Sequence, residues 1–290
     1  MKQLLLVFTI LFSPSFSAQK TETFKIKKYQ IAILGDSLKE SSGLNFFNGK
    51  LYTFNDSGNS AELFQISLDS AKIQKKLNTK LRNEDWESLT NDGENFYIGD
   101  FGNNLGSRKD LKIYKIPFRD SLVLDSTKTI SFYYPEQKDF TPKNLNNDFD
   151  GEAMIFLNGK IHIFTKEWKS KETTHYIINP ENFENQAAEK IETFKTDFVV
   201  TDASYFEDKL YLIGYTKLAK VYLIVFKKSE NDTFFRETPK KYYLGSAFSL
   251  SQIEGIAVNK DGIYISGEEF HSPLGIKKGQ FFFIPFSDFD

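Results

Sequence analysis

The chain has 290 residues and a formal net charge of −2, from 37 Lys and Arg against 39 Asp and Glu. This nearly neutral balance supplies no basic field for a polyphosphate backbone, so we expect no nucleic-acid partner. The absence of cysteine excludes disulfides, thiolate metal sites and a cysteine nucleophile, while 30 Phe and 14 Tyr residues favour β-strands.

The first residues, 1–18, have the order of regions found in a secretory signal peptide. One basic residue precedes an apolar run from Leu4 to Phe12, a Ser-Pro pair ends the run, and small residues follow. A helix of this length spans about 14 Å, about half a bilayer, so it is too short for a membrane span. We predict cleavage after Ser17 or Ala18, export to the periplasm or the exterior, and one soluble mature domain at residues 19–290.

A short motif recurs five times along the rest of the chain. Each copy has a polar or acidic residue followed by a small residue and usually an aliphatic one: Glu40–Leu44, Asp85–Leu89, Asp150–Met154, Val200–Ser204 and Gln252–Ile256. Taking Ser42, Glu87, Glu152, Asp202 and Glu254 as equivalent positions, consecutive copies are separated by 45, 65, 50 and 52 residues. A period near 50 residues is typical of the blades of a β-propeller.

Strand-like segments follow each copy in a regular order. A turn leads into a second strand (LYTF, FYIG, IHIF, LYLIG, IYISG), and a third strand follows (ELFQI, LKIYKI, HYIIN, VYLIVF, QFFFIPF). A weaker fourth strand precedes the next motif, as in TISFYY and KKYYLG. Four strands form one propeller blade. The longest interval also contains four strands, and its extra length is a loop at residues 135–147.

The two ends of the mature chain complement each other. The last unit reaches Asp290 after only three strands, whereas an additional strand-like segment runs from Phe24 to Leu34 before the first motif. Pairing the two would close the ring and remove exposed sheet edges. We therefore predict an all-β fold, a single β-propeller of five four-stranded blades, with six blades as the alternative.

The motif residues predict a metal site in the central channel. The first strand of each blade lines this channel, so we expect Ser42, Glu87, Glu152, Asp202 and Glu254 to converge there. At about 6 Å and an effective dielectric constant of about 20, each carboxylate pair repels by about 2.8 kcal/mol. No motif carries Lys or Arg, so a metal ion or bound protons must compensate. Oxygen ligands without cysteine or histidine favour Ca²⁺ over Mg²⁺. Alternatively, each acid accepts hydrogen bonds from the neighbouring blade and binds no ion.

The series ESSGL, DWESL, DGEAM, TDAS and IEGIAV resembles the soluble calcium-activated apyrases. That family is built on five-bladed propellers, surrounds a central Ca²⁺ with inner-strand Ser and Glu residues, and hydrolyses nucleoside di- or triphosphates. The resemblance implies that Ser42, Glu87, Glu152 and Glu254 are calcium ligands, whereas Asp202 stands where the family has Ser. The phrases NDSGN, DWESL, IGDFGNN and IEGIAV also resemble uncharacterised secreted propellers of phytase-like or esterase-like type.

The loops after the second strands should surround the mouth of the channel. Asp56 and Asp100 lie in two of these loops and are candidate acid–base or metal-binding residues, although the Gly and Asn beside them also fit tight turns. Further candidates are expected to bind the substrate through charge or stacking, and they are Trp86, Arg108, Lys166, Trp168 and His271. Either Trp side chain could instead be a packing residue.

These features support two functions. The first is an exported monomeric propeller that binds Ca²⁺ and hydrolyses a small anionic phosphoester or phosphoanhydride, with a carboxylate activating water. The second is a non-catalytic propeller that binds a glycan, a peptide or a surface partner. No G-x-S-x-G, phosphate-loop or H-E-x-x-H sequence is present, so no standard catalytic signature decides between them.

Overall fold

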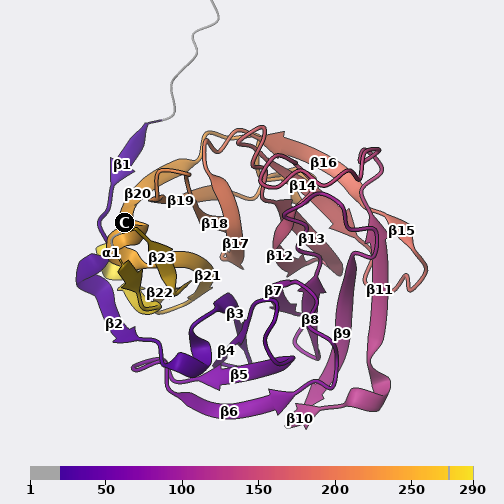
Figure 1. The fold of residues 1–290 in the computed structure, drawn as a ribbon, viewed down its shortest axis with the longest axis horizontal. Coiled ribbons are helices and arrows are strands. Elements are labelled where there is room, and N and C mark those ends of the chain that lie inside the picture. Colours follow the sequence, from indigo (N-terminus) through magenta and orange to yellow (C-terminus); the bar gives the residue numbers. More distant parts are fainter. Residues whose placement is uncertain (1–19, 274, 290) are drawn as a thin grey trace, which may run out of the picture.

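The computed structural model describes residues 20–273 and 275–289, which form five blades around a central axis (Figure 1). The innermost strands of neighbouring blades contact each other all the way round the ring, in the order β3, β7, β12, β17 and β21. The five-bladed propeller predicted from the sequence is thereby confirmed. The predicted signal peptide lies outside the described residues.

Each blade is an antiparallel sheet of four main strands, numbered outward from the axis. The first blade contains β3 (Ser41–Phe47), β4 (Lys50–Asn55), β5 (Glu62–Ile66) and β6 (Ile73–Asn78). The second contains β7 (Trp86–Asn91), β8 (Asn95–Asp100), β9 (Lys112–Arg119) and β11 (Lys128–Tyr133), with the short β10 (Ser121–Leu122) beside β9. The third contains β12 (Gly151–Leu157), β13 (Lys160–Thr165), β14 (Thr173–Ile178) and β16 (Glu189–Phe194). The two-residue β15 (Gln186–Ala187) pairs with β11 and so links the second and third blades.

The fourth blade contains β17 (Val199–Phe206), β18 (Lys209–Tyr215), β19 (Lys220–Lys227) and β20 (Lys240–Ser246). A single helical turn, α1 (Ala247–Leu250), leads into the fifth blade. The fifth contains β21 (Gln252–Asn259), β22 (Gly262–Glu268) and β25 (Gln280–Pro285), and between the last two the chain forms a hairpin of β23 (Phe270–Ser272) and β24 (Gly275–Lys277). Across residues 20–273 and 275–289, no helix has the length and apolar character needed to cross a membrane.

The N-terminal segment closes the ring, as the sequence predicted. Strand β2 (Gln30–Ile33) pairs antiparallel with β25 and completes the fifth blade. The segment is not one strand, because a 3₁₀ turn at Lys27–Tyr29 separates β2 from β1 (Thr21–Thr23). Strand β1 pairs parallel with β20 of the fourth blade. The same stretch of chain therefore joins the fourth and fifth blades and covers both of their outer edges (Figure 1).

The core is divided among the five interfaces between blades. Each of five apolar clusters combines side chains from two neighbouring blades. Between the first and second blades, for example, Phe54 and Trp86 pack edge to face with ring centroids 5.6 Å apart. Both faces of each sheet are thus covered, and most residues of the inner strands are buried whether they are apolar or polar. This packing fixes the inner strands, on which the site below is built.

Candidate functional site

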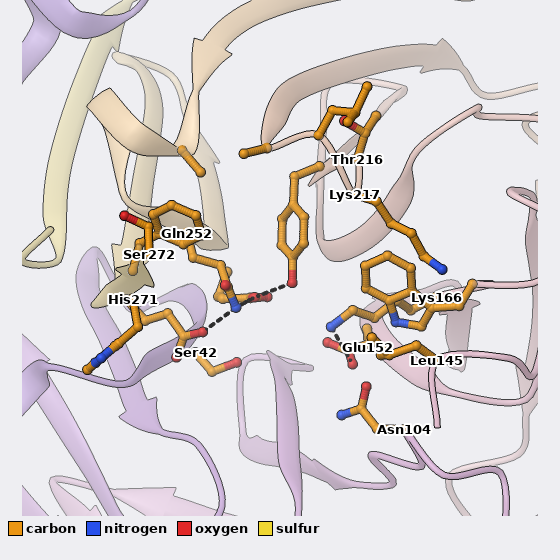
Figure 2. A pocket seen from close by; sticks show the side chains of 18 of the residues that line it. Ser42, Asn104, Leu145, Glu152, Lys166, Thr216, Lys217, Gln252, His271 and Ser272 are labelled. Atoms are coloured by element: carbon orange, nitrogen blue, oxygen red, sulfur yellow. Dashed lines mark hydrogen bonds and ion pairs between the residues drawn. The ribbon is translucent and has the colours of Figure 1, made fainter. Parts of the chain in front are cut away.

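A cavity of about 820 Å³ lies at the end of the ring where the inner strands begin and the second strands end (Figure 2). Every blade contributes to its lining. Its acidic lining residues are Asp56, Glu87, Glu152, Glu254 and Glu268, and its basic ones are Lys166, Lys217 and His271. The cavity therefore contains more carboxyl groups than basic side chains.

A β-bulge near the start of every inner strand decides which side chain enters this cavity. The pairing with the second strand skips one residue, which is Glu87 in β7, Glu152 in β12 and Glu254 in β21. In β3 and β17 the skipped residues are Gly43 and Thr201. A bulge leaves its extra residue unpaired and redirects its side chain, so the three glutamates project into the cavity.

The bulges show that two predicted metal ligands, Ser42 and Asp202, are not equivalent to the three glutamates. Ser42 lies one position before the bulge; it lines the cavity, and its hydroxyl donates to the carbonyl of Glu87 at 3.4 Å. Asp202 lies one position after the bulge and does not line the cavity. Its Oδ2 accepts backbone N–H bonds from Ile256 at 2.8 Å and from Leu44 at 3.2 Å. Asp202 thus accepts hydrogen bonds from other blades, as the alternative without a metal ion predicts.

Lys166 supplies a positive charge inside the ring of glutamates. It follows β13, its backbone N–H donates to the carbonyl of Asp150 at 2.7 Å, and its Nζ lies 2.9 Å from Glu152 Oε1 (Figure 2). The side chains of Lys166 and Glu152 are only 7% and 1% exposed. Burial by itself lowers the pKa of Lys166, but Glu152 and further acids raise it well above its usual value. The expectation that no basic side chain enters the ring was wrong, because this lysine comes from a loop rather than from a motif.

Glu254 accepts hydrogen bonds from two uncharged side chains, Gln252 and Tyr215. Its Oε1 accepts bonds from Gln252 Nε2 at 2.9 Å and from the Tyr215 hydroxyl at 3.2 Å. Gln252 Nε2 also donates to Glu268, so the amide joins two carboxyl groups (Figure 2). Burial is the main cause that raises the pKa of Glu254 and of Glu268. This side of the cavity can therefore hold protons at its carboxyl groups.

Three carboxylates of the first and second blades lie close enough together to hold a metal ion. Among the described residues, no other such group occurs. One oxygen each from Asp56, Asp85 and Glu87 lies within 4.8 Å of the others. The backbone of Gly102 lies against this group, since a Cβ there would come within 2.4 Å of Glu87 Oε1 and 2.5 Å of Asp85 Oδ2. A glycine at this position keeps the space between the carboxylates free.

The titration of this group reflects burial and mutual repulsion. Burial and then the charge of Asp56 raise the pKa of Asp85 to about 6. Burial, followed by Glu152 and Asp56, raises the pKa of Glu87 well above its usual value. Burial also raises the pKa of Asp56. The ionised group is therefore unfavourable by itself, and a bound cation would relieve this cost.

Asp100 and Arg108 contact the backbone beside this carboxylate group. Asp100 is fully buried, its carboxylate accepts the backbone N–H of Asp85 at 3.3 Å, and Arg108 Nη2 donates to it at 2.9 Å. Arg108 Nη1 also donates to the carbonyl of Gly102 at 3.0 Å. Neither side chain lines the cavity. Both side chains contact the backbone of Asp85 and Gly102 instead of the cavity, and the catalytic role of Asp100 and the substrate contact of Arg108 stay predictions.

The remaining predicted substrate-binding residues fall into two groups. Trp168 and His271 line the cavity, and His271 Nε2 lies 2.9 Å from Glu269 Oε1. Trp86 is completely buried in the core between the first and second blades and does not reach the cavity. Its packing alternative is therefore the correct one, since its indole fills the space beside Phe54.

Sequence reasoning missed several polar residues of the site. Asp85 stands two positions before Glu87, and this spacing could have indicated a shared location. Glu268 is the last residue of the fifth blade's second strand and Lys166 comes directly after the third blade's, so the repeat itself contained the signal. Gln252 and Tyr215 carried no such signal, because amide and phenol groups occur at many structural positions.

Comparisons with known proteins give no family for this chain. No family model and no curated protein matches it. A PQQ-bound aldose sugar dehydrogenase from Streptomyces coelicolor is 10% identical, with 88% of this chain and 96% of that one covered and a TM-score of 0.47. A candidate 6-phosphogluconolactonase from Bacteroides uniformis is 14% identical, with 87% and 71% covered and a TM-score of 0.36. The β-propeller domain of Swd1 from Myceliophteria thermophila is 8% identical, with 78% and 66% covered and a TM-score of 0.39. At these scores nothing about activity follows, and the resemblance to the apyrases is not confirmed.

Proposed function

We propose that the protein binds a divalent cation, Ca²⁺ first, at Asp56, Asp85 and Glu87 and hydrolyses a small anionic phosphoester or phosphoanhydride in the adjoining cavity. The observation that carries this proposal is the convergence of three carboxylate oxygens within 4.8 Å at the wall of a large cavity. Among the described lining residues, the Ser42 hydroxyl donates to a backbone carbonyl rather than to a base, so water is the expected attacking group.

The residues present fit such an ion. Calcium prefers oxygen ligands and takes six to eight of them, so three carboxylates leave positions for other oxygens. Gly102 keeps the space between Asp85 and Glu87 open, and burial and mutual repulsion raise the pKa values of both acids. When bound, the ion would act as a Lewis acid toward a phosphoryl oxygen.

The chain's own residues have definite roles in this proposal. The ammonium of Lys166 lies inside the ring of glutamates, where it offsets part of the negative charge that an anionic substrate would meet. Asp100 and Arg108 hold the backbone of Asp85 and Gly102 in place. Glu268 and Glu254, joined through Gln252, are the acid–base groups on another side of the cavity.

A panel of phosphoesters and nucleotides, assayed with Ca²⁺ and with EDTA, tests this proposal. We expect turnover that EDTA abolishes and that Glu87→Gln reduces by about 100-fold or more, because the substitution removes a charged ligand. Lys217→Met is the matched control, since Lys217 lines the same cavity but is exposed and distant from the three acids in the blade order. Absence of turnover with Ca²⁺, Mg²⁺ or Mn²⁺ would refute hydrolysis.

A second function is supported by the aromatic side chains that line the cavity. Trp168, Phe248 and Phe270 line the same cavity as the polar Gln252 and Glu268, a combination that also suits binding of a glycan without catalysis. In that case a glycan array shows binding that EDTA leaves unchanged, and the phosphoester panel shows no turnover.

A further inference from the structure

One wall of the cavity exposes large apolar side chains. Leu218 is 77% exposed and Phe248 is 48% exposed, and neither belongs to any of the five core clusters of the described residues. Phe270 and Pro273 line the cavity beside them, and the rings of Phe248 and Phe270 pack edge to face at 5.3 Å. We call these four residues the apolar wall. Exposed apolar side chains that gather at a cavity indicate a surface that is covered by a ligand.

The apolar wall and the three acids of the proposed metal site come from different blades. Leu218 lies in the turn between β18 and β19, Phe248 lies in α1, and Phe270 begins β23, so the wall belongs to the fourth and fifth blades. The three acids of the proposed metal site belong to the first and second blades. Lys166, from the third blade, lines the same cavity.

This division points to a ligand with two chemically different ends. We propose that the substrate carries an aromatic or bulky alkyl group that packs on the apolar wall while its anionic group faces the metal site and Lys166. The inference rests on the proposed function, and it narrows the substrate class to anionic esters with an apolar substituent. Such a ligand would cover Leu218 and Phe248, two exposed side chains that lie outside the core clusters.

Two non-hydrolysable probes that differ only in the apolar group test the wall. We would titrate phenylphosphonate and methylphosphonate into the protein by calorimetry, with Ca²⁺ and with EDTA. We expect phenylphosphonate to bind about tenfold more tightly, which corresponds to about 1.4 kcal/mol, because only the phenyl ring can cover the wall. Leu218→Ser and Phe248→Ser should each reduce this ratio toward one and leave methylphosphonate binding unchanged.

Ile33→Ser is the matched control. Ile33 is 60% exposed, but it lies in the outer strand β2, away from the cavity. The control should keep the wild-type ratio, and thermal melts should show that all three variants remain folded, since each replaces an exposed side chain.

The two dissociation constants separate the failure of the wall from the failure of the metal site. A ratio of one in the wild-type protein, or a ratio that Leu218→Ser and Phe248→Ser leave unchanged, overturns the wall. Equal affinities in Ca²⁺ and EDTA contradict the proposed metal site while the ratio still reports on the wall. Sedimentation provides a further check, because a dimer that Leu218→Ser dissociates would show that a second copy covers the wall, which would also overturn this inference.

Discussion

Replacing Lys166 by methionine tests whether this lysine is the internal counter-charge of the glutamate ring. Methionine keeps an unbranched apolar side chain but removes the ammonium that lies 2.9 Å from Glu152. Burial raises the pKa of Glu152, and Lys166 opposes that shift. Without the lysine, Glu152 can stay buried only if it binds a proton.

The free energy of protonating Glu152 determines how much stability Lys166→Met loses. At pH 7, protonating a carboxyl whose unfolded pKa is 4.5 costs at most about 3.4 kcal/mol, since each pKa unit is worth about 1.36 kcal/mol. At pH 5 the same cost is only about 0.7 kcal/mol. An acid whose folded pKa is raised destabilises the fold increasingly as the pH rises above its unfolded pKa. The deficit of the variant must therefore grow between pH 5 and pH 7.

Urea denaturation of the wild-type protein and Lys166→Met at both pH values measures this deficit. We expect a loss of about 2–3 kcal/mol at pH 7 and less than about 1 kcal/mol at pH 5. Lys217→Met, which removes an exposed lysine of the same cavity, should change the unfolding free energy by less than about 0.5 kcal/mol at either pH. A deficit for Lys166→Met that is equal at both pH values would refute the reasoning.

Three further predictions concern the frame around the site. Asp202→Ala should lower the unfolding free energy by about 2–4 kcal/mol, because it leaves the buried amides of Leu44 and Ile256 unpaired. It should not weaken Ca²⁺ binding. Denaturation and calcium titration of the variant check both results. Burial lowers the pKa of His162 to about 4. The stabilising contribution of the neutral imidazole is therefore present above pH 6.5 and is lost as the pH falls toward 4. Over that range, the difference in urea stability between wild type and His162→Asn should change by about 3 kcal/mol. Removing the chain up to the end of Gln30–Ile33 should cost several kcal/mol in a thermal or urea melt, since it exposes the edge of β25; unchanged stability would show that β2 does not close the ring.

The repeat in the sequence predicted the number of blades and the closure of the ring. Both rest on strand-sized apolar segments in a regular order, which a β-propeller must have. The bulges could not be predicted, because a shift of one residue in the pairing leaves the sequence pattern unchanged. Ser42 and Asp202 were consequently aligned with Glu87 although they lie on either side of the bulged position.

The charge balance and the apolar wall depend on contacts that the local sequence pattern does not indicate. Lys166 stands 14 residues after Glu152 and meets it because the turn between β12 and β13 folds the second strand back along the first. Leu218, Phe248 and Phe270 come from three separate connections, so no local pattern marks them as one surface. The sequence indicates which residues can carry chemistry, whereas the ring determines which of them meet.

Calcium titration of the wild-type protein, Glu87→Gln and Glu254→Gln tests the proposed metal site most directly. Both substitutions remove one buried carboxylate that projects from a bulge, but only Glu87 belongs to the three-carboxylate group. We predict one Ca²⁺ per chain in the wild type, a loss of affinity of about 100-fold or more in Glu87→Gln, and a change of less than about threefold in Glu254→Gln. No calcium binding by the wild type, or an equal loss in both variants, would contradict a metal site at Asp56, Asp85 and Glu87.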